Sequence, residues 1–362
     1  MIINFVSPIL GLSGGCRVLA IYAARLRKRG HTVTVVAPAH RILPWHLPFF
    51  RGRPKASVPQ PPSHFDGLDV PLHLVNKHAP DIDDMPDADV VVATWWLTAE
   101  WVATLPVSKG AKAYFIQHHE IHSNLPIQRV RGTYRLPLRK IVIAQWLADV
   151  MRSEYGDGDV DLVPNSVDHQ QFFAPPRGRQ ERPTVGLLYS SMDWKRFALA
   201  AEALARVRRA LPNLRVECFG TERPERDLPP FMNFTFDPPQ SSLRDLYAAC
   251  DVWLTASSSE GFNLPAMEAM ACRTPVVATR TGWPAEAIVD GVNGACVGID
   301  DVEALARETE RLLRLSDEDW RALSDGAYAT VRDSSWERST DLFEAALRRI
   351  AAARDTSPEA TA

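Results

Sequence analysis

The stretch that decides the fold reads Cys250-Asp-Val-Trp-Leu-Thr-Ala-Ser-Ser-Ser-Glu-Gly-Phe-Asn-Leu-Pro-Ala-Met-Glu-Ala-Met-Ala-Cys-Arg-Thr-Pro-Val-Val277. Its first residues form an apolar run that predicts a buried strand, and a short polar loop leads from there to a helix near Pro265. In an α/β sheet, ligands bind beyond the carboxyl ends of the strands, where helix N-termini present free N–H groups. Glu260 in the loop and Glu268 one turn inside the helix can therefore converge on one bound molecule.

A strand-helix-strand pattern also opens the chain. Residues 2–6 predict a buried strand, residues 18–26 have the apolar spacing of a helix, and residues 31–37 predict the next strand. Gly14 and Gly15 precede the helix, and a glycine pair at this turn lets the backbone approach a phosphate closely. The same pair is also compatible with a tight turn that binds nothing.

The length of the chain and an internal linker both indicate two domains. A chain of 362 residues is too long for one typical core. Residues 174–183 are rich in proline and charge without apolar periodicity, which is typical of a domain boundary, and the strand-helix pattern starts again at Thr184. We therefore expect an N-terminal domain over residues 1–175, a second domain over 176–336 and a disordered tail over 355–362.

The overall composition is that of an ordinary globular protein. Hydrophobic residues make up 46% of the chain and charged residues 23%, and the net charge of −3 gives no argument for nucleic-acid binding. No apolar run is long enough to span a bilayer, and the first residues lack the charged start of a signal peptide. Five scattered cysteines are interpreted as buried thiols in a reducing compartment, so we expect a cytoplasmic protein.

Three features of the first half leave alternatives open. The proline-dense residues 39–64 predict an extended loop, either a solvated insertion or a wall of an acceptor site. Basic residues between Arg129 and Lys140 predict a solvated face, or else contact with anionic lipid or an acceptor phosphate. His118 and His119 follow a predicted strand over residues 112–117, and neighbours on an extended backbone cannot easily face one metal ion, so a polar loop is favoured.

The motif around Glu260 resembles the signature of the retaining glycosyltransferases of family 4, in which two glutamates are separated by seven residues. The residues that follow are similar too: Pro275-Val-Val-Ala-Thr279, Gly282, Glu286 and Asp290-Gly-Val-Asn-Gly294. The resemblance implies an α/β fold of the GT-B type, with two Rossmann-like doubly wound domains facing across a cleft. It also implies that a final helix, about residues 337–354, packs back on the N-terminal domain.

The resemblance further implies roles for single residues. Lys195 would bind the diphosphate, Glu260 would face the sugar ring, and Glu268 would accept the ribose hydroxyls. Family members often have a histidine that faces the donor sugar, which is carried over to His118 or His119. The catalytic candidates are Glu260, His118 and Lys195. The donor-binding candidates are Gly14, Gly15, Lys195, Arg196, Glu260, Gly261, Phe262, Asn263, Leu264 and Glu268.

Two positions depart from the family pattern. An arginine is usual shortly before the diphosphate lysine, but Tyr189-Ser190-Ser191 occupies that region here, so the second cation is missing or is supplied by Arg196. Asn263 stands where glycine is usual, and asparagine tolerates a positive φ.

The resemblance implies a retaining glycosyltransferase that takes a sugar from a nucleoside-diphosphate sugar and gives it to a carbohydrate, lipid-linked or small-molecule acceptor. We expect no cofactor, and no metal because no Asp-x-Asp stands at a suitable strand end. The alternatives are a non-catalytic nucleotide-sugar-binding subunit, which the absent arginine favours, and a phosphorylase or epimerase on the same fold. Peripheral contact with the inner face of the membrane stays open.

Overall fold

The structure, a computed structural model, describes residues 1–39, 62–77, 79–224 and 227–355. Most of the proline-dense loop and the expected disordered tail lie outside these residues. The chain divides into two compact units: unit 1 holds residues 1–164 and the chain from Glu337 on, and unit 2 holds residues 165–336. The boundary between the two units thus lies before the linker at residues 174–183, where the sequence predicted it.

The linker itself belongs to unit 2 because its side chains are bound there. The guanidinium of Arg177 donates to the backbone oxygen of Cys250, and that of Arg179 donates to backbone oxygens at the end of a helix of the same unit. The backbone N–H of Gln180 donates to Oδ1 of Asp251 at 2.7 Å. The segment that the sequence predicts as a domain boundary is therefore an ordered edge of unit 2.

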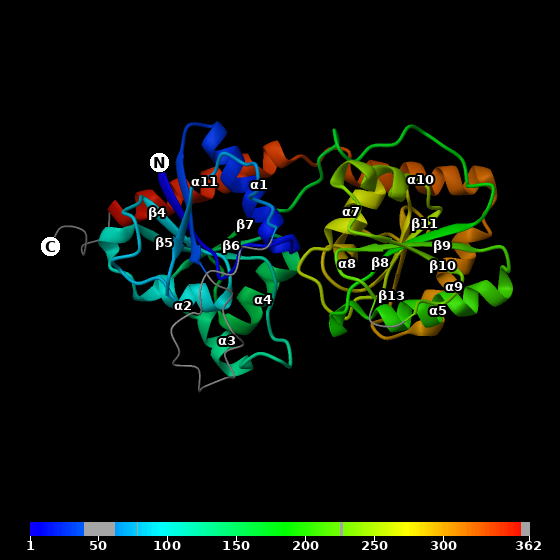
Figure 1. The fold of residues 1–362 in the computed structure, drawn as a ribbon, viewed down its shortest axis with the longest axis horizontal. Coiled ribbons are helices and arrows are strands. Elements are labelled where there is room, and N and C mark those ends of the chain that lie inside the picture. The colour runs from blue at the N-terminus through cyan, green and yellow to red at the C-terminus, as the bar shows by residue number, and fades with distance from the viewer. Residues whose placement is uncertain (40–61, 78, 225–226, 356–362) are drawn as a thin grey trace. The chain divides into compact units, whose positions relative to one another are not determined.

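Unit 1 is a parallel seven-stranded sheet covered by helices on both faces (Figure 1). The strand order is β3-β2-β1-β4-β5-β6-β7, so the order reverses between β1 and β4. The strands are β1 (Ile2–Val6), β2 (Thr32–Pro38), β3 (Leu72–Val75), β4 (Val90–Ala93), β5 (Ala111–Ile116), β6 (Arg139–Val142) and β7 (Val160–Leu162). The helices are α1 (Gly14–Lys28), α2 (Trp96–Thr104), η1 (Val107–Lys109), α3 (Ile127–Thr133), α4 (Gln145–Tyr155) and α11 (Trp336–Asp355).

Strand β4, at the centre of the unit 1 sheet, is a continuous apolar run. All four residues of β4 are buried, as is expected for a parallel sheet with helices on both faces. The helix α1 starts at Gly14 instead of near Val18, because Ser13 caps it and accepts a hydrogen bond from the backbone N–H of Cys16 at 3.3 Å. Gly14 and Gly15 are therefore the first residues of the helix and not part of the loop before it.

Helix α11 completes the core of unit 1. The ring of Phe343 is fully buried and stacks on Tyr22 of α1, with 4.4 Å between the ring centroids. It also contacts Phe115 of β5 and Phe5 of β1, at 5.0 Å and 6.0 Å. The red helix therefore lies against α1 and the sheet (Figure 1), although more than 300 residues separate it from α1 in sequence.

Unit 2 is a six-stranded parallel sheet with the order β10-β9-β8-β11-β12-β13. Helices α5 and α9 cover one face, and α7 and α10 cover the other (Figure 1). The strands are β8 (Thr184–Leu188), β9 (Arg215–Gly220), β10 (Met232–Phe236), β11 (Val252–Thr255), β12 (Val276–Thr279) and β13 (Gly294–Val297). The helices are η2 (Asp193–Lys195), α5 (Phe197–Ala210), η3 (Gln240–Ser242), α6 (Leu243–Ala248), α7 (Leu264–Ala271), α8 (Pro284–Ala287), α9 (Val302–Leu313) and α10 (Asp317–Val331).

Both sheets have the doubly wound order in which the chain starts in the middle, runs to one edge, returns and runs to the other. The expectation of two Rossmann-like doubly wound domains is therefore confirmed. In such sheets the ligand site lies at the point where the order reverses, which is between β1 and β4 in unit 1 and between β8 and β11 in unit 2.

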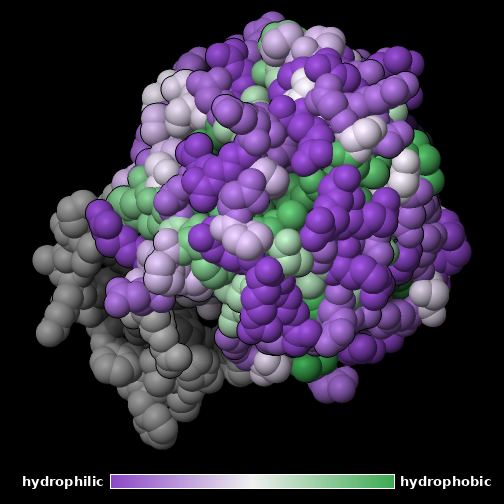
Figure 2. Space-filling view, turned by 90° about the vertical axis from the view of Figure 1, so that its right-hand side faces the viewer, coloured by the Kyte–Doolittle hydropathy of each residue, from purple (hydrophilic) through white to green (hydrophobic). Residues whose placement is uncertain are grey.

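Within the described ranges, no helix is both long enough and apolar enough to cross a bilayer. On the face shown in Figure 2, hydrophilic residues predominate and hydrophobic residues lie between them in smaller areas.

Candidate active site

The candidate site of unit 2 lies at the carboxyl ends of β8 and β11, where the strand order reverses. The loop after β8 carries Lys195, and the loop after β11 carries Glu260. The two loops are joined because the backbone N–H of Ser258 donates to the backbone oxygen of Trp194 at 2.7 Å. Parallel topology thus places side chains that are 65 residues apart in sequence at one edge of one sheet.

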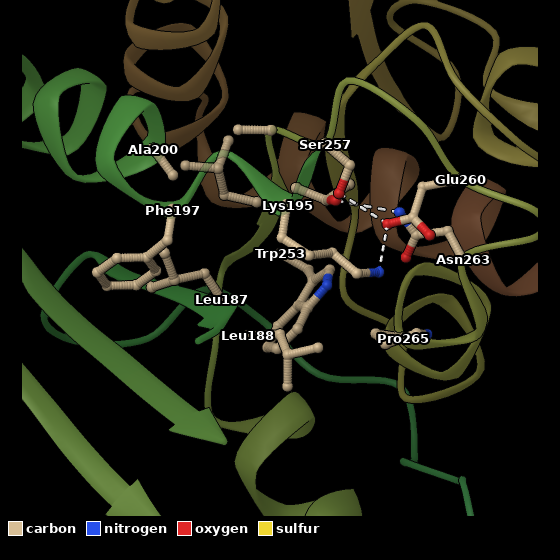
Figure 3. A pocket seen from close by; sticks show the side chains of 13 residues that line it. Leu187, Leu188, Lys195, Phe197, Ala200, Trp253, Ser257, Glu260, Asn263 and Pro265 are labelled. Atoms are coloured by element: carbon tan, nitrogen blue, oxygen red, sulfur yellow. Dashed lines mark hydrogen bonds and ion pairs between the residues drawn. The ribbon is translucent and has the colours of Figure 1, made fainter. Parts of the chain in front are cut away.

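Lys195 and Glu260 form an ion pair at this edge. Nζ of Lys195 lies 2.7 Å from Oε1 of Glu260, and Oγ of Ser257 donates to the same oxygen at 2.7 Å. Figure 3 shows the two charged side chains pointing toward each other from their separate loops. The side chain of Glu260 is 8% exposed and that of Lys195 is 26% exposed, so the lysine is the member that solvent and a ligand can reach.

A small cavity adjoins this pair. Its volume is about 20 Å³, and its lining includes Lys195, Glu260 and Asn263 together with residues of β8, β11 and α5. That volume holds roughly one water molecule and no nucleotide. A nucleotide at the ion pair would therefore extend beyond this cavity.

Asn263 fixes the start of α7. Its φ is +80°, and its Oδ1 accepts a hydrogen bond from the backbone N–H of Ala266 at 3.4 Å. Its amide nitrogen donates to Oγ1 of Thr255 at the end of β11, at 3.0 Å. The residue that replaces the usual glycine therefore adopts the left-handed conformation and also caps the helix. Pro265 lies in the first turn, as the sequence predicted.

A second loop supports Glu260 from the side of β12. Gly282 has a φ of +59°, and a Cβ built there would lie 2.7 Å from Cβ of Glu260 and 2.9 Å from the backbone oxygen of Phe262. The ring of the next residue, Trp283, stacks on Phe262 with 5.5 Å between centroids, and the backbone N–H of Trp283 donates to the backbone oxygen of Phe262 at 2.9 Å. This close packing fixes the loop that carries Glu260, Gly261 and Phe262.

Arg196 points to a different partner. Its Nε lies 2.9 Å from Oδ1 of Asp300, which follows β13, and Arg196 is not part of the cavity lining. In the segment where the family arginine is usual, the backbone N–H and Oγ of Ser191 donate to the carboxylate of Glu222 at 2.5 Å and 2.8 Å. The structure thus brings one of the two expected cations to Glu260.

Glu268 lies apart from that pair. It is 3% exposed, it is absent from the cavity lining, and its Oε2 accepts a hydrogen bond from the hydroxyl of Tyr247 at 2.8 Å. Leu264 precedes it by one turn on α7.

The site residues of unit 1 lie at the carboxyl edge of its own sheet. At the start of α1, the backbone oxygen of Gly15 accepts from Nε2 of Gln117 at 3.2 Å, and an added Cβ at Gly14 would meet no described atom within 4 Å. The backbone at Gly14 is therefore accessible, which a phosphate contact requires. That role stays a prediction.

The two neighbouring histidines have different surroundings. Nε2 of His119 lies 2.6 Å from the hydroxyl of Tyr155, and burial lowers the pKa of His119. His118 is half-buried, with its ring 4.8 Å from that of His122 and 6.4 Å from that of Trp146. Of the two, His118 is therefore the better placed to reach a ligand.

Glu120 has a structural partner. Its Oε2 accepts from the backbone N–H of Trp96 at the start of α2, at 3.1 Å, and burial raises its pKa well above the usual value.

Throughout the described part of the chain, no group of three or more His, Cys, Asp or Glu side chains is arranged to hold a metal ion.

The basic run of unit 1 is occupied by partners within the unit. Arg129 pairs with Glu100 at 2.6 Å, and Lys140 pairs with Asp157 at 2.8 Å. The remaining cations have these partners: Arg131 with Glu154, Arg135 with the backbone oxygen of Glu154, and Arg139 with Asp159. This pattern favours the solvated face over a lipid-binding surface.

Sequence reasoning missed three residues that shape the site, Ser257, Trp283 and Tyr247, and it missed the contact that a fourth, Gly282, makes with Glu260. Ser257 stands in a run of three serines, where no one position is marked. Tyr247 lies in a helix whose pattern signals only packing. Gly282 was noted as part of the family string, but its contact with Glu260 depends on how two loops fold together.

Comparisons with known proteins find relatives of the segment that carries this site. Residues 183–315 match the family Glycosyl transferases group 1. The D-inositol 3-phosphate glycosyltransferase of Mycobacterium leprae (strain Br4923) is 42% identical over 118 residues, which are 32% of this chain and 28% of that relative. The match thus spans less than a third of the relative.

Solved structures resemble nearly the whole chain. HepE from Anabaena in complex with UDP-glucose superposes with a TM-score of 0.72 at 16% identity, covering 99% of this chain and 100% of that one. Sucrose-phosphate synthase from Thermosynechococcus elongatus gives 0.72 at 17% identity, with coverage of 98% and 100%. The chain therefore has the GT-B fold, and its residues 183–315 are similar to the glycosyl transferases group 1.

Proposed function

We propose that the chain is a retaining glycosyltransferase of family 4 that transfers a sugar from a nucleoside-diphosphate sugar to a carbohydrate, lipid-linked or small-molecule acceptor. The observation that carries the proposal is the ion pair of Lys195 and Glu260 at the reversal point of the unit 2 sheet, inside the segment that matches the glycosyl transferases group 1. A cation and a carboxylate side by side suit a substrate that carries both a diphosphate and a sugar.

The donor would bind through opposite charges. The ammonium group of Lys195 would neutralise the leaving diphosphate, and the N–H groups at the start of α7 would donate to phosphate or sugar oxygens. Glu260 would face the sugar ring, where a carboxylate stabilises the positive charge that develops as the anomeric bond breaks. Glu268 would accept the ribose hydroxyls, and the start of α1 at Gly14 and Gly15 would approach the diphosphate.

The chemical step would be a front-face displacement. The bond between the anomeric carbon and the diphosphate oxygen breaks, the acceptor oxygen bonds to the same face of that carbon, and the acceptor proton passes to the leaving phosphate. His118 would contact the donor sugar. The reaction so written needs no cofactor and no metal ion, because Lys195 and backbone N–H groups carry the countercharge.

The test starts with the donor. Binding of UDP-glucose, GDP-glucose and ADP-glucose is measured by calorimetry without metal, and the best donor is then assayed for hydrolysis and for transfer to sugars and inositol phosphates. Inositol phosphates are included because of the relative's name. We expect turnover that EDTA leaves unchanged and a product whose anomeric configuration, measured by NMR, equals that of the donor. An inverted product would contradict the retaining mechanism.

Glu260→Gln removes the charge and keeps the shape. We expect turnover to fall by at least about 100-fold with donor affinity changed much less, as for loss of one charge-stabilising group. The matched control is Glu303→Gln, an exposed acid of α9 in the same unit. Full turnover in Glu260→Gln would contradict the assignment.

One observation favours a second candidate, the non-catalytic nucleotide-sugar-binding subunit. Arg196 is paired with Asp300, so of the two expected cations Lys195 alone pairs with Glu260 among the described residues. Such a subunit would bind the donor but would not transfer its sugar to any acceptor at a measurable rate. That outcome would favour the non-catalytic subunit over the glycosyltransferase.

A further inference from the structure

A buried hydrogen bond between α6 and α7 has no part in the chemistry described above. The hydroxyl of Tyr247 donates to Oε2 of Glu268 at 2.8 Å, and the two residues are 1% and 3% exposed. We propose that Tyr247 is a positioning residue that holds the Glu268 carboxylate in the orientation that recognises the ribose diol of the donor. The inference rests on the proposed function, because it needs a nucleotide in unit 2.

Tyr247 is itself held from several sides. Its ring contacts Trp253 of β11 edge to face, with 4.7 Å between centroids, and lies 5.9 Å from Phe219 at the end of β9. Its backbone oxygen accepts from Oγ1 of Thr274 at 2.7 Å and from the N–H of Cys250 at 3.1 Å. The hydroxyl is therefore presented to Glu268 from a fixed side chain.

A carboxylate with so little exposure needs such a donor. Burial of a charged group without hydrogen bonds is costly, and one well-placed hydroxyl offsets part of that cost. A carboxylate can accept about four hydrogen bonds, so a bond from Tyr247 is compatible with bonds from both ribose hydroxyls. Tyr247 thus sets the plane of the carboxylate while the carboxylate remains able to bind the ligand.

This arrangement predicts specificity for the ribose diol. With Tyr247 in place, the carboxylate is oriented before the nucleotide arrives, so little of the binding free energy is spent on ordering it. Without the hydroxyl, the carboxylate loses its orientation and its contact with the diol weakens. The rest of the nucleotide, which contacts other groups, is bound as before.

The experiment compares ligands with and without the diol. Calorimetry gives the dissociation constants of UDP, GDP, ADP and their 2′,3′-dideoxy analogues for the wild-type chain, Tyr247→Phe and Glu268→Gln. Tyr328→Phe is the matched control, since Tyr328 is a tyrosine of α10 whose ring faces the guanidinium of Arg273. Thermal unfolding of each variant measures folding separately.

We expect the wild-type chain to prefer the ribose form by about 10- to 100-fold, the range of hydrogen bonds to a charged group. In Tyr247→Phe, that preference should be roughly tenfold smaller, while the dideoxy form binds as it does to the wild-type chain. Loss of stability alone weakens both forms equally and leaves the ratio unchanged, so the ratio separates positioning from structure.

Three other outcomes overturn the inference at different points. If no nucleotide binds, the proposed donor site is wrong and this role falls with it. If the wild-type chain binds both forms equally, Glu268 does not recognise the diol, although the transferase activity can still hold. If Tyr247→Phe keeps the full preference and Glu268→Gln loses it, only the role of Tyr247 is wrong.

Discussion

Gly282 and Glu260 pack closely against each other in the candidate site. A methyl group on Gly282 would lie 2.7 Å from Cβ of Glu260, and the φ of +59° is itself unfavourable for any other residue. Gly291 in the same unit also has a positive φ, +76°, but an added Cβ there meets no described atom within 4 Å. Alanine at Gly291 therefore introduces backbone strain alone, whereas alanine at Gly282 introduces backbone strain and a steric clash with Glu260.

We predict that Gly282→Ala lowers the stability of unit 2 by about 2 to 4 kcal/mol, the sum of a left-handed alanine and an overpacked contact. Gly291→Ala should cost about 1 kcal/mol, from the backbone alone. Denaturant unfolding measures both. Donor binding should fall in Gly282→Ala and stay normal in Gly291→Ala, and equal effects of the two substitutions would show that the contact with Glu260 is unimportant.

At the scale of residues, sequence reasoning found the groups that a motif names. Lys195 and Glu260 were both predicted, and the structure brings them within 2.7 Å. The partner of Arg196 was not predicted, because Asp300 is 104 residues away and the contact depends on the path of the loop after β13. The tyrosine bound to Glu268 was missed for the same reason: a hydrogen bond between two helices leaves no pattern in either.

Both apolar contacts and ion pairs hold helix α11 to unit 1. Phe343 fills a space between Tyr22 and Phe115, whereas its neighbour Leu342 is 41% exposed. We predict that Phe343→Ala destabilises unit 1 by about 3 to 5 kcal/mol and that Leu342→Ala costs less than about 1 kcal/mol. Thermal unfolding followed by tyrosine and tryptophan fluorescence measures this. Similar losses in the two variants would mean that α11 does not complete the core.

Glu344 is the centre of one group of ion pairs between α11 and the rest of unit 1. Burial opposes its ionisation, but hydrogen bonds from Arg348, Arg29 and His31 outweigh burial and lower the pKa of Glu344 to about 2. In an unfolded chain the pKa of a glutamate is about 4.3. The lower pKa in the folded state means that the ionised group adds stability above pH 4.3 and that this stability is lost as the pH falls toward 2.

We therefore predict that Glu344→Gln destabilises unit 1 at pH 7 and that its difference from the wild-type chain disappears between about pH 4.5 and pH 2. Asp341→Asn is the control, because Asp341 pairs with the same Arg29 but its side chain is 66% exposed. Urea unfolding at several pH values measures the difference. A difference that persists unchanged at pH 2 would contradict the role of the charge.

At the scale of elements, strands and helices with strong apolar patterns were predicted, and their ends were not. The sequence predicted the start of α1 four residues late because glycines break helical patterns, while the cap by Ser13 decides where the helix begins. The linker at residues 174–183 was predicted as a domain boundary because it is rich in proline and charge. Arginine side chains that bind backbone oxygens of unit 2 make it ordered, and composition carries no information about such bonds.

In the sequence of the whole chain, unit 2 is inserted between two segments of unit 1. Unit 2 is continuous over residues 165–336, whereas unit 1 needs residues 1–164 and α11. The two doubly wound folds were predictable because each repeats strands and helices in alternation. Only the family resemblance indicated which unit the last helix packs on.

We predict that a fragment of residues 165–336 folds alone and binds the same nucleoside diphosphate as the whole chain, since its core is made from one continuous segment. A fragment of residues 1–164 should aggregate or melt at a lower temperature, because the surface around Tyr22 and Phe115 is uncovered. Joining residues 337–355 to it through a flexible linker should restore folding. Circular dichroism and size-exclusion chromatography measure this, and a stable 1–164 fragment would contradict the prediction.

The separation of α11 from the rest of unit 1 has a consequence for how the chain is made. A ribosome that has completed β7 must still add all of unit 2 before Phe343 appears, which takes on the order of 10 to 40 s at ordinary rates of synthesis. During that time the nascent chain carries an uncovered aromatic surface formed by Phe5, Tyr22 and Phe115, the kind of surface that chaperones shield. Unit 2, although it is synthesised later, is then the first to reach its final form.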